Sequence, residues 1–157
     1  MLLTALLVSG GCKRRRGEIA STAFAGDPAF AGHFTSGFYD IEANAWRWTN
    51  KEFAVTLNPP AHAGERGAQL VMHLAIPDPV IQHSQFVELS CSLGGLKLEP
   101  QVFAKPGTYT YARDVPADKL QGKEVRIDFA LDHAMPAAPP DIRQLGIVVS
   151  EVGLVAK

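Results

Sequence analysis

The most distinctive aromatic and charged residues of the chain lie close together, in one stretch that contains Asp40, Glu42, Trp46, Arg47 and Trp48. In an extended strand, alternate side chains point to opposite sides, so the two indoles share one side and the guanidinium takes the other. Two such indoles can stack on a pyranose ring while the charged groups hydrogen-bond its hydroxyls. These five residues are therefore candidate ligand-binding residues. The alternative is that at least one indole is buried, because aromatic side chains supply much of the buried area in β-sandwich cores.

A second pair of charged residues, Asp141 and Arg143, precedes the last apolar run. The two residues are two positions apart, so in an extended strand their side chains point to the same side. Arginine forms bidentate pairs with carboxylates that lysine does not reproduce. We expect Arg143 to form a structural ion pair with Glu42 or Asp40 and so to tie the ends of the domain together. A ligand clamp at the same edge is the alternative.

Catalytic and metal-binding motifs are absent from the sequence. The five histidines lack the HExxH spacing, and no second cysteine lies near Cys91. Asp132 and His133 could begin a proton relay, but no Gly-x-Ser-x-Gly motif accompanies them. Glu42 with Asp132 or Asp141 could form the carboxylate pair of a glycoside hydrolase, although the sequence gives no distances. We expect no catalytic residue, no metal and no cofactor.

The N-terminal segment 1–12 resembles a bacterial lipoprotein signal. An apolar run from Leu2 to Val8 is followed by small residues and by Cys12, which such signals acylate. The run is too short to span a bilayer. We expect Cys12 to carry a lipid anchor that holds the protein in the cell envelope. A chance cysteine in an ordinary tail, in a protein that stays in the cytoplasm, is the alternative.

Composition sets the class of protein that must position these residues. The chain has 157 residues, of which 46% are hydrophobic and 20% charged, as in one soluble globular domain. Four of its 15 cations lie together in residues 13–16, so the rest of the chain is net acidic. Nucleic-acid binding requires a broad basic surface that neutralises many phosphates. We therefore expect no nucleic-acid partner.

Short alternating apolar runs predict the fold. Such runs occupy residues 53–57, 70–76, 87–93, 96–98, 109–115, 125–131 and 145–154, and no segment keeps a helical period. Gly94 and Gly95 predict a hairpin turn, and a change of phase near Ser150 predicts a β-bulge. The pattern predicts an all-β, antiparallel β-sandwich of jelly-roll type with seven to nine strands. We assign residues 13–36 to a linker and residues 37–157 to the sandwich.

Two motifs suggest a family. Residues 37–48 have the form Gly-aromatic-x-x-x-Glu…Trp-Arg-Trp, and residues 141–146 have the form Asp-x-Arg-x-Leu-Gly. Together they resemble a little-characterised bacterial β-sandwich module found beside glycosyltransferases or in cell-envelope polysaccharide proteins. The resemblance covers about residues 35 to 155. It implies a jelly roll of carbohydrate-binding type.

Three functions follow as hypotheses. The favoured one is a non-catalytic, glycan-binding module of the cell envelope, with a polysaccharide or glycan as its partner. The alternative is a structural or assembly lipoprotein of the envelope, and a small glycoside-acting hydrolase is the third.

Overall fold

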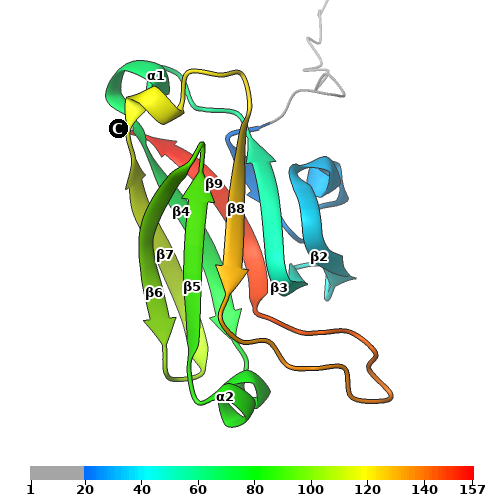
Figure 1. Cartoon of the computed structure of the whole chain (residues 1–157). Helices are drawn as coiled ribbons and strands as arrows, with labels where there is room; N and C mark the ends of the chain where they lie inside the picture. The colour runs from blue at the N-terminus through cyan, green and yellow to red at the C-terminus, as the bar shows by residue number, and fades with distance from the viewer. Residues whose placement is uncertain (1–19) are drawn as a thin grey trace, which may run out of the picture.

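The computed structural model describes residues 20–157, which form nine strands and four short helical segments (Figure 1). The strands are β1 (Thr22–Phe24), β2 (Phe34–Glu42), β3 (Trp46–Leu57), β4 (Ala68–Ile76), β5 (Val87–Leu93), β6 (Leu96–Phe103), β7 (Gly107–Val115), β8 (Val125–Leu131) and β9 (Val148–Ala156). The helical segments are η1 (Pro28–His33), α1 (Ala63–Arg66), α2 (Asp78–Ser84) and η2 (Ala117–Lys119). The predicted all-β class is confirmed. Within residues 20–157, no helix is long and apolar enough to cross a membrane.

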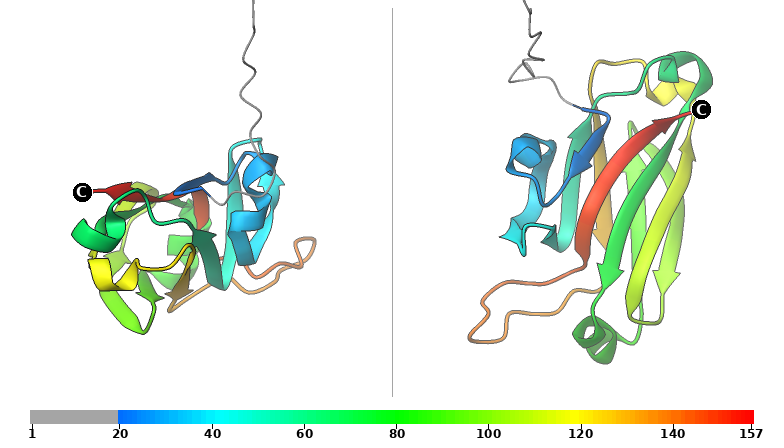
Figure 2. Two further views of the ribbon diagram at one scale, coloured as in Figure 1. Left: turned by 90° about the horizontal axis from the view of Figure 1, so that it is seen from above. Right: turned by 180° about the vertical axis from the view of Figure 1, so that it is seen from behind.

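The strands pair antiparallel throughout and form two packed layers. The front sheet has the order β6-β5-β8-β3-β2, and the back sheet has the order β7-β4-β9-β1. This order is that of a jelly roll, with β2 added at the edge of the front sheet. Strand β3 joins the layers, because Arg47 and Trp48 pair with β9 while residues 52–57 pair with β8. Seen from above, the sandwich is a nearly closed ring (Figure 2).

The core lies between the layers and follows the predicted alternation. Front-sheet residues such as Phe53, Leu89 and Phe129 point inward and are at most 2% exposed. Cys91 shares their parity and is buried as well. The intervening residues of the same strands point outward, so the front sheet has a polar outer face.

Both predicted irregularities are present. Gly94 and Gly95 have φ of 52° and 78° and form the turn between β5 and β6. In the β4–β9 ladder His73 lies opposite Glu151 and Leu74 opposite Val149, so Ser150 is the extra residue of a bulge. The bulge places Val149 and Val152 on the same buried face.

The domain begins earlier than the predicted boundary at residue 37. Strand β1 pairs with β9, and Ala23, Ala25 and Phe34 belong to the core. Residues 22–36 therefore lie in the sandwich and not in a linker. Their small and polar composition concealed a strand that is only three residues long.

A long excursion separates β8 from β9. Residues 132–147, here called the arm, project beyond the sandwich (Figure 1), and isolated bridges join Met135 to Leu145 and Ala138 to Asp141. At its base Gly146 packs so closely on Thr49 and Leu131 that a Cβ atom would overlap both side chains. The glycine thus lets the arm return against β3 before β9 begins.

Candidate functional site

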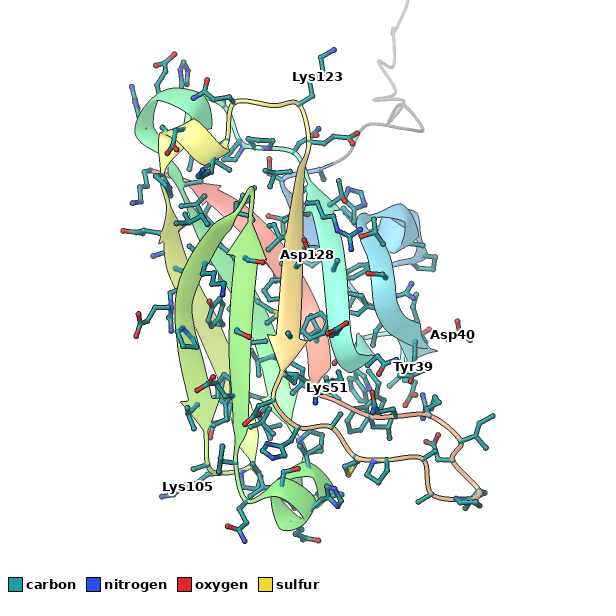
Figure 3. The ribbon with its side chains drawn as sticks, in the orientation of Figure 1. Tyr39, Asp40, Lys51, Lys105, Lys123 and Asp128 are labelled. Carbon is teal, nitrogen blue, oxygen red and sulfur yellow. The ribbon has the colours of Figure 1, made fainter. Side chains whose placement is uncertain are left out.

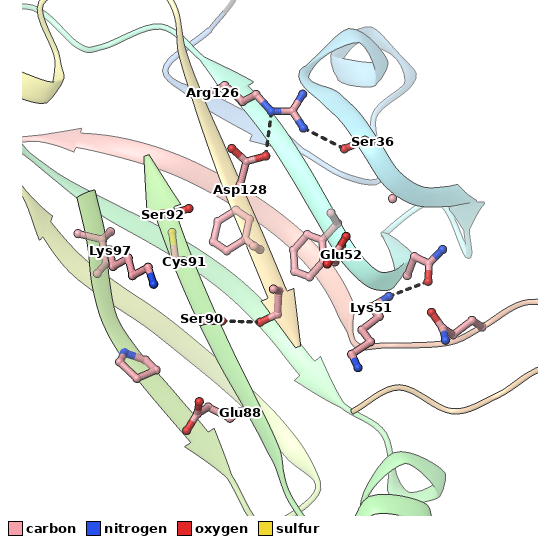
Figure 4. Close-up of a pocket in the computed structure, with 18 residues that line it drawn as sticks. Ser36, Lys51, Glu52, Glu88, Ser90, Cys91, Ser92, Lys97, Arg126 and Asp128 are labelled. Carbon is pink, nitrogen blue, oxygen red and sulfur yellow. Dashed lines mark hydrogen bonds and ion pairs between the residues drawn. The ribbon is translucent and has the colours of Figure 1, made fainter. Parts of the chain in front are cut away.

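A groove of about 890 Å³ crosses the outer face of the front sheet (Figure 4). Its lining comes from β2, β3, β8, β5 and β6, together with Gln144 of the arm. Five strands and one loop thus contribute to one surface. Because the strands are fixed in a ladder, the side chains that they present hold their relative positions.

Strand register explains why this part of the sheet is hollow. Pairing aligns Lys97, Ser92, Asp128, Ala54 and Ser36 in one row across the five strands. Short side chains thus occupy most of this row. The next row contains Ser90, Ala130 and Glu52 and again has small residues at its centre. Longer charged side chains stand around this low floor.

The polar groups of the groove are partly bound to one another. Arg126 Nε donates to Asp128 Oδ1 at 2.8 Å, and Arg126 Nη2 lies 3.4 Å from Ser36 Oγ. The Ser90 hydroxyl donates to the carbonyl oxygen of Ala130 at 3.1 Å. Both residues of the ion pair are about half exposed, so their remaining donors and acceptors face solvent and can meet a ligand.

Beneath this surface the core is aromatic and inert. Phe53 and Phe129 stack with ring centroids 5.1 Å apart, and each is 2% exposed. Burial raises the pKa of the Cys91 thiol to about 12, so the sulfur stays protonated near neutral pH. Cys91 is thus a buried core residue and not a nucleophile.

The two candidate tryptophans do not line the groove. Trp46 is 36% exposed at the start of β3, whereas Trp48 is half-buried and packs on the core. The two indoles therefore differ in environment although they share parity. Trp46 lies opposite Glu42 in the β2–β3 ladder, so this indole is next to one of the charged groups expected with it. A sugar-binding role for the two tryptophans stays a prediction.

Arg47 is occupied within the fold. Its Nε donates to the carbonyl oxygen of Ala25 and its Nη1 to that of Tyr39, both at 3.1 Å. The guanidinium also lies 5.3 Å from the ring centre of Phe34. Arg47 thereby fastens the segment after β1 to β2. Asp40 lies on the exposed end of β2, away from Lys51 and Asp128 (Figure 3).

Arg143 joins the arm to β2 through two carboxylates. Its Nη1 lies 2.6 Å from Glu42 Oε1 and its Nη2 lies 2.8 Å from Asp141 Oδ2. The guanidinium is 5.3 Å from the ring centre of Tyr39, whose hydroxyl donates to the carbonyl oxygen of Gln144 at 2.8 Å. The structure thus contains the ion pair considered from the sequence. Whether it serves the fold or a ligand stays a prediction.

These contacts shift the ionisation of the cluster. The side-chain and backbone hydrogen bonds of Arg143 lower the pKa of Asp141 to about 2. Hydrogen bonds to Asp141 and Glu42 raise the pKa of Arg143 above its ordinary value. Asp141 and Arg143 are therefore both charged over the physiological range.

The other sequence candidates lie apart from the groove. Asp132 accepts from the backbone N–H of Glu88 at 2.7 Å and lies 2.9 Å from His133, and neither residue lines the groove. Unlike the half-exposed His133, His33 is buried, and its Nε2 accepts a hydrogen bond from the backbone N–H of Ala20. Residues 20–157 hold no group of three or more His, Cys, Asp or Glu side chains arranged for a metal ion. Cys12 lies outside the described residues.

Sequence reasoning did not assign the residues of the groove to a site. The available signal was the polar parity of residues 87–93 and 125–131, with serines on one strand and Arg126 and Asp128 on the other. Such alternation marks any half-exposed strand. Only the pairing of β5 with β8 shows that the two polar faces form one surface.

The solved structures to which this chain is similar include the following two. One, described as "CBM4 structure and function", has a TM-score of 0.41 and 13% identity, over 87% of this chain and 85% of that chain. The other is dimeric latent PorU from Porphyromonas gingivalis, with a TM-score of 0.42 and 12% identity, over 85% of this chain and only 12% of PorU.

No family model and no curated protein match the chain. The family suggested by the two sequence motifs therefore stays a prediction.

Proposed function

We propose that the chain is a non-catalytic glycan-binding module of the bacterial cell envelope and that the groove is its binding surface. The supporting observation is the chemistry of the lining, where carboxylates, ammonium groups, a guanidinium, hydroxyls and an amide converge on one open surface. A glycan presents many hydroxyl groups, each of which donates and accepts. Hydrogen bonds to charged partners are the stronger ones, and rigid strands supply several of them without the cost of ordering a backbone.

A glycan array probed with the full chain carrying Cys12→Ser tests this proposal. The informative variant is Ala130→Trp, which places an indole on the floor of the groove without entering the core. Ala75→Trp is the matched control, because Ala75 is an equally half-buried alanine facing outward on the back sheet. We expect Ala130→Trp to abolish binding and Ala75→Trp to preserve it.

Trp46→Ala and Trp48→Ala extend the same assay to the residues first considered. Both should bind as the parent does, since neither tryptophan lines the groove. Loss of binding in Trp46→Ala with retention in Ala130→Trp would move the site to the start of β3. A reducing-end assay on the bound glycans tests the hydrolase alternative, for which the sequence suggests Glu42 with Asp132 or Asp141 as the acids.

Attachment to the membrane through Cys12 is part of the proposal. A fatty-acid probe fed to the native bacterium should label the parent chain and leave Cys12→Ser unlabelled. Equal labelling of the two chains would show that Cys12 carries no lipid. The proposed location in the cell envelope would then lose its support.

One observation favours the assembly alternative. Ile142 is 83% exposed near the tip of the arm, and Trp46 is also exposed. Contiguous exposed apolar surface marks protein interfaces, so these two side chains are where contact with a partner would be sought. If Ile142→Ser released a protein partner captured by cross-linking in the native envelope and the array showed no bound glycan, the assembly function would replace the glycan-binding one.

A further inference from the structure

The groove holds six charged side chains, three of each sign: Lys51, Lys97, Arg126, Glu52, Glu88 and Asp128. Arg126 and Asp128 bind each other. No ion pair within the described part of the chain involves the side chains of the other four. The groove therefore presents two free cations and two free anions.

The spacing of the strands keeps two of the unlike pairs apart. Lys97 on β6 and Glu52 on β3 are separated by β5 and β8, which at about 4.8 Å per strand spacing amounts to roughly 14 Å. Glu88 on β5 and Lys51 on β3 are two spacings apart, roughly 10 Å. Figure 4 shows Lys97 and Lys51 at opposite sides of the groove, with Glu88 below Ser90. Ion pairs require about 4 Å, so these groups remain available to a ligand.

Stacking contributes nothing at this surface. The aromatic residues of the lining, Phe53 and Phe129, are both buried beneath it. Affinity must then come from hydrogen bonds and charge. A purely acidic glycan would meet Glu52 and Glu88, and a purely basic one would meet Lys51 and Lys97, so each would be repelled by half of the free charges.

From this arrangement we infer that the ligand is an amphoteric glycan, one whose sugars carry both free amino groups and carboxylates. This inference rests on the proposed function and specifies its ligand class. The lysines bind the carboxylates, the glutamates bind the ammonium groups, and Ser92 with the Arg126–Asp128 pair binds hydroxyls between them.

Four forms of one oligosaccharide test the charge requirement on a constant backbone. Hyaluronan hexasaccharide carries carboxylates only, and N-deacetylation adds amino groups to make the amphoteric form. Reducing the carboxyl groups of each gives a neutral and a purely cationic form. Calorimetry with the full chain carrying Cys12→Ser should show the amphoteric form binding about tenfold more tightly than the other three.

Charge-removing variants assign each ligand group to its partner. Lys51→Gln with Lys97→Gln should abolish the preference for carboxylates and leave the preference for amino groups. Glu52→Gln with Glu88→Gln should do the reverse. Lys105→Gln with Lys123→Gln is the matched control, since both lysines lie outside the groove (Figure 3) and should leave all four affinities unchanged.

The outcomes separate this inference from the proposed function. Equal binding of the neutral and amphoteric forms, or variants without effect on the charge preference, would overturn the ligand class and leave glycan binding in place. Binding of none of the four forms would also overturn it. The array then decides the wider question, because glycan binding that Ala130→Trp abolishes would keep the function, and an empty array would remove both.

Discussion

Two arginines in this molecule perform the same geometric task with different partners. Arg143 lies over Tyr39 and joins the arm to β2, and Arg113 lies over Tyr111 with its guanidinium carbon 4.4 Å from the ring centre. Arg143 binds the carboxylates of Glu42 and Asp141. Arg113 instead donates to backbone carbonyl oxygens.

The Arg113 site closes the open edge that the ring has, within residues 20–157, between β6 and β7; this edge is here called the seam. These consecutive strands form no ladder with each other. Side chains span the gap: Tyr111 donates to the carbonyl oxygen of Glu99 at 3.0 Å, and Arg113 donates to the carbonyl oxygens of Glu99 and Pro100 at 2.7 and 3.0 Å. An arginine that lies over a tyrosine ring can thus join two parts of a fold in two ways. It binds carboxylates, in which case salt and acid weaken the contact, or it binds neutral backbone oxygens, in which case they do not.

The largest expected effect is at Tyr111. This side chain is fully buried, so Tyr111→Ala leaves a cavity and should lower the free energy of unfolding by about 3–5 kcal/mol. Tyr111→Phe removes only the hydroxyl and should cost about 1 kcal/mol. Urea denaturation followed by tryptophan fluorescence measures both. Equal losses in the two variants would show that the hydrogen bond, and not the packing, closes the seam.

Arg113→Lys should have an intermediate effect. Lysine cannot reach several carbonyl oxygens in a planar fork, so the free energy of unfolding should fall by about 1–2 kcal/mol. Because the acceptors are neutral, the loss measured by denaturation should hardly change when salt is raised. A loss that disappears in high salt would assign Arg113 to an ion pair after all.

A smaller effect is expected at Arg143. Its side chain and that of Glu42 are 31% and 38% exposed, so water screens the pair and Arg143→Ala should cost no more than about 1 kcal/mol. The double variant with Glu42→Gln should lose less than the two single losses added together, and high salt should reduce the effect. Undiminished loss at high salt would contradict the charge-based role.

Acid provides a separate test of the same cluster. The pKa of Asp141 is lowered to about 2, so the carboxylate stabilises the fold above its unfolded pKa, near 3.9, and this contribution disappears as pH falls towards 2. In Arg143→Ala the pKa of Asp141 should return towards its ordinary value. Between pH 5 and 2, the melting temperature of Arg143→Ala should then fall less than that of the parent. Identical pH profiles of the melting temperature would show that Arg143 does not lower the pKa of Asp141.

The smallest effect concerns Cys91, which reports on the seam. Its buried thiol has a pKa of about 12 and hydrogen-bonds with Tyr111, so alkylation of the native protein should be very slow. Labelling followed by mass spectrometry should be modestly faster in Tyr111→Phe and Arg113→Lys and unchanged in Arg143→Ala. Faster labelling in Arg143→Ala alone would show that the arm, and not the seam, controls access to the core.

The sequence predicted features that depend on side-chain type and local spacing. Alternation located the strands on either side of Gly94 and Gly95, the change of phase located the bulge, and the unlike charges of Arg143 and Glu42 suggested their contact. Strand β1 was missed because three residues provide too little alternation. Each success used information contained within one short segment or in one pair of charges.

The seam and the groove were not predictable in the same way. Arg113 donates to backbone oxygens, which every residue possesses, so no residue type marks its partners. The groove depends on register: shifting β5 by one residue against β8 would turn Ser90 and Ser92 inward and bring Cys91 to the surface. Trp46 and Trp48 are conspicuous in the sequence and do not line the groove, and their role as ligand-binding residues stays a prediction.

The pairing of β1 with β9 has a mechanical consequence. Thr22 lies opposite Gly153, so the chain enters β1 at the same end of the sandwich where β9 leaves (Figure 1). Tension applied between residues 20 and 157 would open this antiparallel pair one hydrogen bond at a time, and would not shear all its bonds at once. A three-residue strand loaded in this way yields at low force, which makes β1 the first part of the domain to detach when the protein is pulled.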